Sequence, residues 1–167
     1  MRRPRLKIAV VSAAAVLASV ACTGAALGDA SHAGWPAING ELRMHKSDQD
    51  GPIHGTGRSD ELLGGHGDDQ IDGGSSGDVI WGDYKPCCQP TSQNDVLVGE
   101  AGRDYIYASH GYNDISAGAG DDVVHAHFGR GTADCGSGRD LLYLSHRSRP
   151  GYRIRHCERI SYHHEGR

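Results

Sequence analysis

Between Gly55 and Tyr143 the apolar and acidic positions of the chain recur every nine residues. Each unit opens with a Gly-rich stretch, reaches an acidic residue at its sixth position and carries one aliphatic residue at its eighth. The Gly-rich half predicts a tight turn. The isolated aliphatic residue between two outward-facing neighbours predicts a very short β-strand. The pattern therefore predicts a series of turn–strand units and no helices in this region.

The nine-residue phase is kept throughout, apart from one insertion. The units read GTGRSDELL, GGHGDDQID, GGSSGDVIW, a fourth unit that begins at Gly82 and resumes at Asn94, and then GEAGRDYIY, ASHGYNDIS, AGAGDDVVH, AHFGRGTAD and CGSGRDLLY. The eighth positions are Leu62, Ile71, Ile80, Leu97, Ile106, Ile115, Val124, Ala133 and Leu142. Asp residues that only form Asx-type turns are the alternative interpretation, but such turns do not account for a strict phase coupled to an aliphatic residue.

These units follow the pattern G-G-x-G-x-D-x-U-x, where U is a large apolar residue, and resemble the RTX (haemolysin-type) calcium-binding repeat family. GGHGDDQID matches the pattern fully, GGSSGDVIW has Ser76 and GTGRSDELL has Arg58 where the fourth position is usually Gly, and ASHGYNDIS and AHFGRGTAD lack the Asp. The resemblance implies an all-β fold. The expected architecture is a parallel β-roll, a right-handed β-solenoid of short strands joined by Gly/Asp turns, with several Ca²⁺ ions between stacked turns.

The chemistry of the turns agrees with that implication. Ca²⁺ takes about six to eight oxygen ligands from carboxylates and backbone carbonyls, and glycine allows a tight turn to direct its carbonyls towards an ion. The expected metal-binding side chains are those at the sixth positions: Asp60, Asp69, Asp78, Asp95, Asp104, Asn113, Asp122 and Asp140. The expected turn glycines are Gly55, Gly57, Gly64, Gly73, Gly99 and Gly118.

Two units make one coil in such a roll, so turns two units apart stack on one edge. We call the edge with Asp60, Asp78, Asp104, Asp122 and Asp140 the odd edge. The even edge has Asp69, Asp95, Asn113 and Gly131 at the equivalent positions. We expect up to four inter-turn calcium sites on the odd edge. The even edge loses its acid along the chain and carries the insertion, so we expect about one site there, near Asp69 and Asp95.

The distribution of charge also favours a metal over nucleic acid as the partner. Residues 55–143 hold 15 Asp and Glu against five Lys and Arg, and such a segment repels itself unless cations neutralise it. One aliphatic residue in nine buries little apolar surface, whereas ordering each residue costs roughly 1–2 kcal/mol. We therefore expect Ca²⁺ binding to be coupled to folding. The basic residues after position 144 are more simply a solvated face than a nucleic-acid site.

Residues 1–28 have the character of a secretory signal peptide. A basic start that includes Arg2 and Lys7 precedes an apolar stretch, and small residues surround a cleavage point before Asp29. The apolar stretch is short for a membrane span. An uncleaved anchor and a lipoprotein attached through Cys22 are alternatives to simple cleavage and secretion. Secretion would expose the remaining cysteines to an oxidising compartment.

We divide the chain into four parts: the signal peptide (1–28), an N-terminal extension with a degenerate leading turn (29–54), the β-roll (55–143, with an insertion at 84–93) and a C-terminal cap (144–167). We expect a disulfide between Cys135 and Cys157, which would fasten the cap over the open end of the roll. Cys87 and Cys88 lie in the insertion. They could form a vicinal disulfide, a metal or redox pair, or a bond that only stiffens the loop.

We predict a secreted calcium-binding protein that folds on binding Ca²⁺ and is not an enzyme, since the metalloprotease motif H-E-x-x-H does not occur. No pair of histidines has the spacing of a structural zinc site. The alternative is an adhesion or glycan-contacting module, using outward positions such as Trp81, Tyr105 and Tyr107, or a small β-helical enzyme acting on polysaccharide. A cell-surface or extracellular polymer would then be its partner.

Overall fold

The computed structural model describes residues 34–45, 49–84 and 90–162. Within these ranges the chain forms two parallel β-sheets and a single 3-10 helix at Arg149–Gly151, with no α-helix. No helix in these ranges is long and apolar enough to cross a membrane. The expected signal peptide with Cys22, and the cysteines Cys87 and Cys88, lie outside the described residues.

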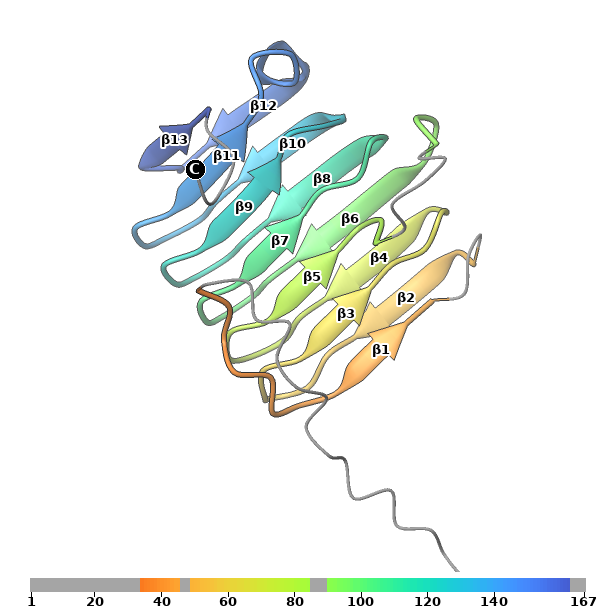
Figure 1. The fold of residues 1–167 in the computed structure, drawn as a ribbon. Coiled ribbons are helices and arrows are strands. Elements are labelled where there is room, and N and C mark those ends of the chain that lie inside the picture. Colours follow the sequence, from red (N-terminus) through yellow and green to blue (C-terminus); the bar gives the residue numbers. More distant parts are fainter. Residues whose placement is uncertain (1–33, 46–48, 85–89, 163–167) are drawn as a thin grey trace, which may run out of the picture. The chain divides into compact units, whose positions relative to one another are not determined.

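Successive strands alternate between the two sheets, so that strands with odd numbers pair in one and strands with even numbers in the other (Figure 1). The odd sheet contains β1 (Leu42–Met44), β3 (Glu61–Leu63), β5 (Val79–Trp81), β7 (Tyr105–Tyr107), β9 (Val123–Ala126), β11 (Leu141–Leu144) and β13 (Arg159–Ser161). The even sheet contains β2 (Gly51–His54), β4 (Asp69–Asp72), β6 (Asn94–Val98), β8 (Tyr112–Ser116), β10 (Arg130–Asp134) and β12 (Tyr152–Arg155).

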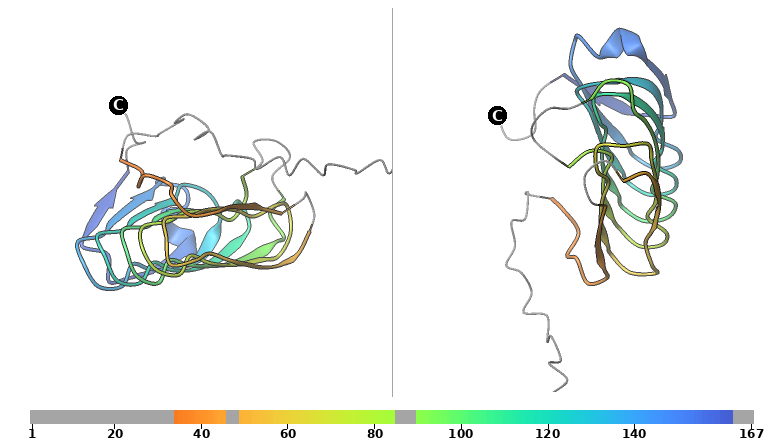
Figure 2. Two further views of the ribbon diagram at one scale, coloured as in Figure 1. Left: turned by 90° about the horizontal axis from the view of Figure 1, so that it is seen from below. Right: turned by 90° about the vertical axis from the view of Figure 1, so that its right-hand side faces the viewer.

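This alternation confirms the predicted all-β parallel roll with two units in each coil. All strand pairs are parallel and join equivalent positions of the repeat, such as Leu62 with Ile80 and Ile80 with Ile106. The two sheets face each other and are joined by turns along both edges (Figure 2). The insertion does not shift the register, because Ile71 still pairs with Leu97.

The eighth position of each unit faces inward from both sheets and supplies the core. These side chains are at most 5% exposed: Ile53, Leu62, Ile71, Ile80, Leu97, Ile106, Ile115, Val124, Ala133 and Leu142. Each strand from β2 to β11 thus contributes one principal apolar side chain to a thin core. Apolar burial contributes about 25 cal/mol for each Å², so a core this thin leaves much of the stabilisation to the turns.

Strand pairing extends beyond residues 55–143 at both ends. β1 and β2 precede the first recognised unit and pair with β3 and β4. In the expected cap region β12 and β13 continue the even and odd sheets. The predicted disulfide between Cys135 and Cys157 is confirmed, with the two Cα atoms 5.1 Å apart. On the chain-entropy model, closing a loop of this length lowers the entropy of the unfolded state and so stabilises the folded state by ~3 kcal/mol.

The outer face of the odd sheet carries a row of stacked rings at the ninth position of successive units. Trp81 stacks on Tyr107 with 4.0 Å between ring centroids, Tyr107 on His125 with 4.4 Å, and His125 on Tyr143 with 4.8 Å. The planes in each pair are within 13° of parallel. The segment before β1 runs along this face, drawn in orange in Figure 2. Its Trp35 donates a hydrogen bond from Nε1 to the Tyr107 hydroxyl at 2.8 Å.

This packing limits the expected contact patch of Trp81, Tyr105 and Tyr107. Tyr105 is only 1% exposed and packs in a second apolar cluster with Val79 and Val123. The rings of Trp81 and Tyr107 present their faces to each other. Sugar recognition by aromatic residues needs an open ring face. The row of rings packs adjacent coils against one another and contacts the N-terminal segment through Trp35.

The single-file core leads to the first prediction. Replacing Ile80 with Ala should lower the free energy of unfolding by about 2–5 kcal/mol, because a fully buried side chain leaves a cavity between two coils. Val96 is a matched control, since it is 40% exposed on the outer face of the even sheet; Val96→Ala should change stability by no more than about 0.5 kcal/mol. Urea unfolding in the presence of Ca²⁺ measures both, and equal effects would contradict the assigned orientation.

Candidate calcium sites on the odd edge

The sixth-position carboxyls of the odd edge form one continuous hydrogen-bonded ladder. The backbone N–H of Asp60 donates to Asp78 Oδ1 at 2.7 Å, and the N–H of Asp78 donates to Asp104 Oδ1 at 2.7 Å. The same contact joins Asp104 to Asp122 and Asp122 to Asp140, each at 2.9 Å. All five side chains are at most 1% exposed. The structure thus gathers the predicted odd-edge residues into one buried row.

The second oxygen of most of these carboxyls is left without a hydrogen bond. Among the described residues, Oδ2 of Asp78, Asp104, Asp122 and Asp140 is buried and has no hydrogen-bond partner. A buried charged acceptor without a partner costs several kcal/mol. Four such atoms in one phase of the repeat point to a common ligand of positive charge.

Backbone carbonyls share the space that these oxygens face. A Cβ atom built on Gly73 would lie 2.7 Å from Asp78 Oδ2 and 3.0 Å from the carbonyl oxygen of Gly99, one coil further on. A Cβ on Gly99 would likewise collide with Asp104 Oδ2 and the carbonyl oxygen of Ala117. Carboxylate and carbonyl oxygens from adjacent coils therefore converge beside each glycine. This donor set fits a hard cation such as Ca²⁺.

The four turns with an unsatisfied Oδ2 share one backbone conformation. Their second residues all have positive φ: Gly74 at 96°, Glu100 at 70°, Gly118 at 105° and Gly136 at 93°. Their third residues are linked from turn to turn by isolated parallel bridges that run from Ser75 to Ser137. Glu100 adopts this conformation without being glycine, at a cost of about 1 kcal/mol or more. Four stacked turns of equal geometry enclose three inter-turn spaces.

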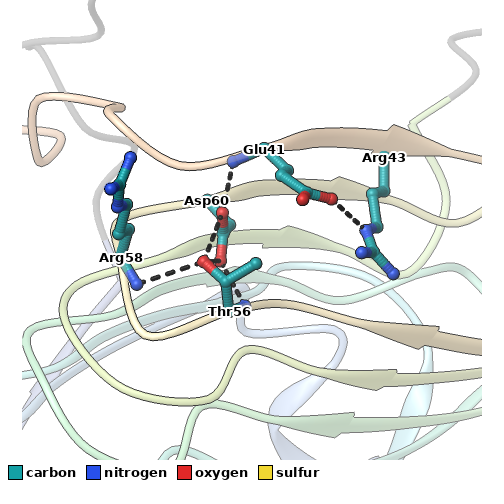
Figure 3. Close-up of polar contacts among 5 residues, drawn as sticks. All are labelled: Glu41, Arg43, Thr56, Arg58 and Asp60. Atoms are coloured by element: carbon teal, nitrogen blue, oxygen red, sulfur yellow. Dashed lines mark hydrogen bonds and ion pairs between the residues drawn. The ribbon is translucent and has the colours of Figure 1, made fainter.

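The first odd turn is different, because protein donors occupy both oxygens of Asp60 (Figure 3). The N–H of Glu41 donates to Asp60 Oδ1. The N–H of Thr56 donates to Asp60 Oδ2 at 2.6 Å, and the Thr56 hydroxyl donates to the same atom at 2.9 Å. Asp60 therefore closes the N-terminal end of the ladder and has no oxygen left unsatisfied.

Glu158 closes the other end of the ladder and was not among the predicted site residues. Its Oε2 accepts the N–H of Asp140 at 2.8 Å, as an Asp of a further unit would. Glu158 follows Asp140 by 18 residues, which is the length of one coil, so counting the period forward beyond the last unit could have found it. Glu41 lies outside the nine-residue phase, and the sequence carried no comparable signal for it.

The even edge begins with two acids that form the same contact. The N–H of Asp69 donates to Asp95 Oδ1 at 3.1 Å. Asp69 is satisfied by protein groups, because His45 Nδ1 lies 2.6 Å from its Oδ1 and the N–H of Gly65 donates to its Oδ2 at 2.9 Å. Asp95 Oδ2 has no hydrogen-bond partner within the described part of the chain. One unsatisfied oxygen thus remains among the sixth-position carboxylates described on this edge.

Further along the even edge, the side-chain amide of Asn113 donates hydrogen bonds to turn carbonyls, the kind of oxygen that a cation would otherwise bind. Asn113 Nδ2 lies 3.2 Å from the carbonyl oxygen of Ser109, 3.3 Å from that of Gly111 and 3.2 Å from the Tyr152 hydroxyl. The Tyr152 hydroxyl donates to the carbonyl of Phe128 at 2.9 Å. Tyr152 thus fills the edge beside Gly131, which has no side chain of its own. These turns are satisfied by neutral protein groups.

The predicted turn glycines fall into two groups. A Cβ atom at Gly55, Gly64, Gly73 or Gly99 would meet the carboxylate of its own turn and a carbonyl of the next coil, so these four border the oxygen-lined spaces. Gly57 and Gly118 do not. The carbonyl of Gly57 accepts a hydrogen bond from the Ser76 hydroxyl at 3.2 Å, and that of Gly118 accepts the N–H of Ser137 at 2.8 Å.

Burial and mutual repulsion raise the pKa of the ladder carboxyls. Burial is the larger cause, and adjacent carboxylates add to it. The pKa is raised to about 7 for Asp78, to about 8 for Asp104, to about 6 for Asp122 and to about 7 for Asp95. Burial also raises the pKa of Asp140. Ionising the whole row at neutral pH is therefore unfavourable without added positive charge.

Nowhere in residues 34–45, 49–84 and 90–162 do three or more His, Cys, Asp or Glu side chains cluster in a way that could hold a metal ion. This agrees with one carboxylate per turn. Carbonyl oxygens must then supply most of the ligands at each odd-edge space, as Ca²⁺ accepts and softer metals do not.

The comparison with known families agrees with this geometry. A family model described as the RTX calcium-binding nonapeptide repeat (4 copies) matches residues 53–83, 91–124 and 99–133. Neither the curated proteins nor the solved structures contain a match to the chain.

The raised pKa values predict how the stability of the metal-free chain varies with pH. The carboxyl of an Asp in the unfolded chain has a pKa of about 4. In the folded chain the ladder carboxyls have pKa values of about 6 to 8, so they stay protonated to higher pH. The folded state therefore binds more protons between these limits, and the free energy of unfolding should fall as pH rises from 4 to 8. Urea unfolding in EDTA should give higher stability at pH 5 than at pH 8. Equal stability at both would contradict the ladder.

Proposed function

Because residues 53–133 belong to the RTX calcium-binding nonapeptide repeat family, we propose that the chain is a secreted protein that folds on binding several Ca²⁺ ions along its odd edge. The observation that carries the proposal is the row of buried, unsatisfied Oδ2 atoms of Asp78, Asp104, Asp122 and Asp140. Bound Ca²⁺ would supply positive charge and oxygen coordination between neighbouring coils. Three sites follow from the three spaces between these turns.

The proposed ligands differ between turns. Asp78, Asp104, Asp122 and Asp140 supply carboxylate oxygens, and Gly73 and Gly99 border spaces that carbonyl oxygens also face. The equivalent positions of the last two turns hold Ala117 and Cys135, each with a Cβ atom. We therefore assign the most open spaces to the N-terminal half of the row. Asp95 could hold one ion on the even edge, whereas Asp60, Asp69 and Asn113 already have protein partners.

Coupling between binding and folding follows from the energetics of the two edges. The odd edge stacks four buried carboxyls, and their repulsion opposes folding until cations neutralise it. The turn of Asn113 on the even edge is held by neutral protein groups, and the Cys135–Cys157 bond is covalent, so neither depends on a metal ion. We propose that these features keep the coils loosely associated in the metal-free chain, and that Ca²⁺ orders the odd edge.

The proposed location and the absence of catalysis rest on the sequence. Residues 1–28 have the features of a leader for export, and the Cys135–Cys157 disulfide is typical of oxidising compartments. We propose a binding role and not an enzymatic one. A partner polymer would have to bind elsewhere than the row of aromatic rings, because those rings stack on one another.

The calcium assignment predicts a specific response to the metal. Far-UV circular dichroism of the chain from residue 29, with disulfides intact, should gain β signal on addition of Ca²⁺ and lose it on addition of EDTA, while Mg²⁺ should have little effect. The double variant Asp104→Asn, Asp122→Asn should bind fewer ions by calorimetry and need at least about tenfold more Ca²⁺ to fold.

Asp114→Asn is the matched control, because Asp114 is an exposed acid on the outer face of the even sheet. It should bind and fold as the unaltered chain does. Unchanged calcium stoichiometry in the double variant, or equal losses in the control, would refute the odd-edge assignment.

The contrast between the edges gives a further prediction. Asn113→Asp restores the repeat pattern in sequence but removes the amide that donates to the carbonyls of Ser109 and Gly111. Each buried group left unsatisfied costs about 1–3 kcal/mol, so the variant should be less stable than the unaltered chain in EDTA. Thermal unfolding in EDTA measures this. An increase in metal-free stability would show that the amide is not needed.

A further inference from the structure

Three polar side chains of the even edge lie together beside the insertion and take no part in the proposed calcium sites. Asp83 precedes the insertion and Gln93 ends it, whereas His66 belongs to the turn one coil earlier. Asp83 is 8% exposed and Gln93 is 4% exposed. The side chain of His66 is 14% exposed. None of the three occupies the sixth position, which supplies the carboxylate in the repeat pattern.

One hydrogen bond fixes the cluster and leaves three atoms unsatisfied. Gln93 Nε2 donates to Asp83 Oδ2 at 2.6 Å. His66 Nε2 lies 3.6 Å from Asp83 Oδ1, which is beyond hydrogen-bonding distance. Across the described ranges, His66 Nε2, Asp83 Oδ1 and Gln93 Oε1 are buried and have no hydrogen-bond partner. One nitrogen and two oxygens of this cluster are thus buried without a hydrogen bond.

The gap between His66 and Asp83 suits an ion better than a direct pair. A charged imidazole and a carboxylate in contact lie about 2.7–2.9 Å apart. Zinc-type ions bind imidazole nitrogen and carboxylate oxygen at about 2.0–2.2 Å, so two ligands of one ion in a bent arrangement can be separated by the observed 3.6 Å.

We propose that His66 Nε2, Asp83 Oδ1 and Gln93 Oε1 form a binding site for a borderline divalent cation of the zinc type. The imidazole nitrogen selects for such ions and against Ca²⁺, which requires oxygen ligands. Three protein ligands leave one coordination position for water. The site draws its residues from two coils and from both sides of the insertion, so a bound ion would fasten the insertion to the roll.

The electrostatic surroundings favour a cation at this point. Burial raises the pKa of Asp83; the hydrogen bond from Gln93 and the positive charges available on His66 and His110 oppose that rise, and Asp69 adds to it. The cluster therefore contains the buried carboxyl of Asp83, and the nearby carboxyl of Asp69 repels its negative charge. A divalent cation would neutralise both more completely than a single imidazolium.

The test is a zinc titration of the chain from residue 29 by isothermal calorimetry, with Ca²⁺ kept at saturation so that the oxygen sites are filled. One Zn²⁺ should bind tightly. His66→Ala and Asp83→Asn should each weaken that binding by at least about tenfold. Co²⁺ in place of Zn²⁺ should give visible absorption that both variants reduce, and circular dichroism in Ca²⁺ verifies that each variant is folded.

His54→Ala is the matched control. His54 Nδ1 lies 3.8 Å from Asp72 Oδ2, but the His54 side chain is 60% exposed and that of Asp72 is 41% exposed. This variant should bind zinc as the unaltered chain does. No tight zinc binding, equal loss in His54→Ala, or binding that survives both site variants and is lost in Cys87→Ser, Cys88→Ser would overturn the proposal. The calcium titration would stand in each case, because it measures different residues.

Discussion

The structure depends on how a thin roll accommodates a row of buried like charges. Each coil of the odd edge adds one carboxyl, and each carboxyl uses one oxygen to accept the backbone N–H of the coil before it. That hydrogen bond fixes the spacing of the coils and holds the second oxygen towards the neighbouring turn. Since each strand from β2 to β11 contributes one principal aliphatic residue to the core, much of the stabilisation is left to the turns. In the function that we propose, cations at this edge are part of the fold and not an addition to it.

The oxygens buried in the turns are satisfied by different groups on the two edges. On the odd edge, carboxylate and carbonyl oxygens of successive coils face one another and leave charge to be neutralised from outside. On the even edge, the side-chain nitrogens of His45 and Asn113 approach the equivalent oxygens. The odd edge is therefore the one that we propose responds to calcium, and the even edge relies more on protein donors. The disulfide and the row of stacked rings add further contacts between coils that do not depend on a metal ion.

This division bears on the stages of folding after export. A chain with both edges acidic would have little to organise it before it met calcium. In the secreted protein that we propose, the even edge, the Cys135–Cys157 bond and the Trp35 contact with Tyr107 would form first, and the odd edge would order when the ions bind. The zinc-type site proposed at His66, Asp83 and Gln93 would belong to the first group, because it fastens the insertion from the side that does not need calcium.

The sequence by itself determined the fold class, the phase of the repeat and the alternation between two edges. It favoured the pairing of Cys135 with Cys157 among three possible pairings, and the structure decided it. A nine-residue period places every equivalent residue at the same point of a coil, so one register predicts all strands between residues 55 and 143. The period also located the odd-edge carboxyls, including the intact series from Asp78 to Asp140.

Only the tertiary structure decided which of these carboxyls lacks a partner. Asp60 and Asp104 look alike in the repeat, but Thr56 and Glu41 donate to the first, and the second keeps one oxygen free of hydrogen bonds. The tertiary structure also decided that Tyr105 is buried and that the N–H of Glu41 closes the ladder. It likewise brought His66 and Gln93 next to Asp83. The physical reason is that a repeat specifies what is equivalent along the chain. Hydrogen-bond satisfaction depends on the residues at the ends and in the insertion, which break that equivalence.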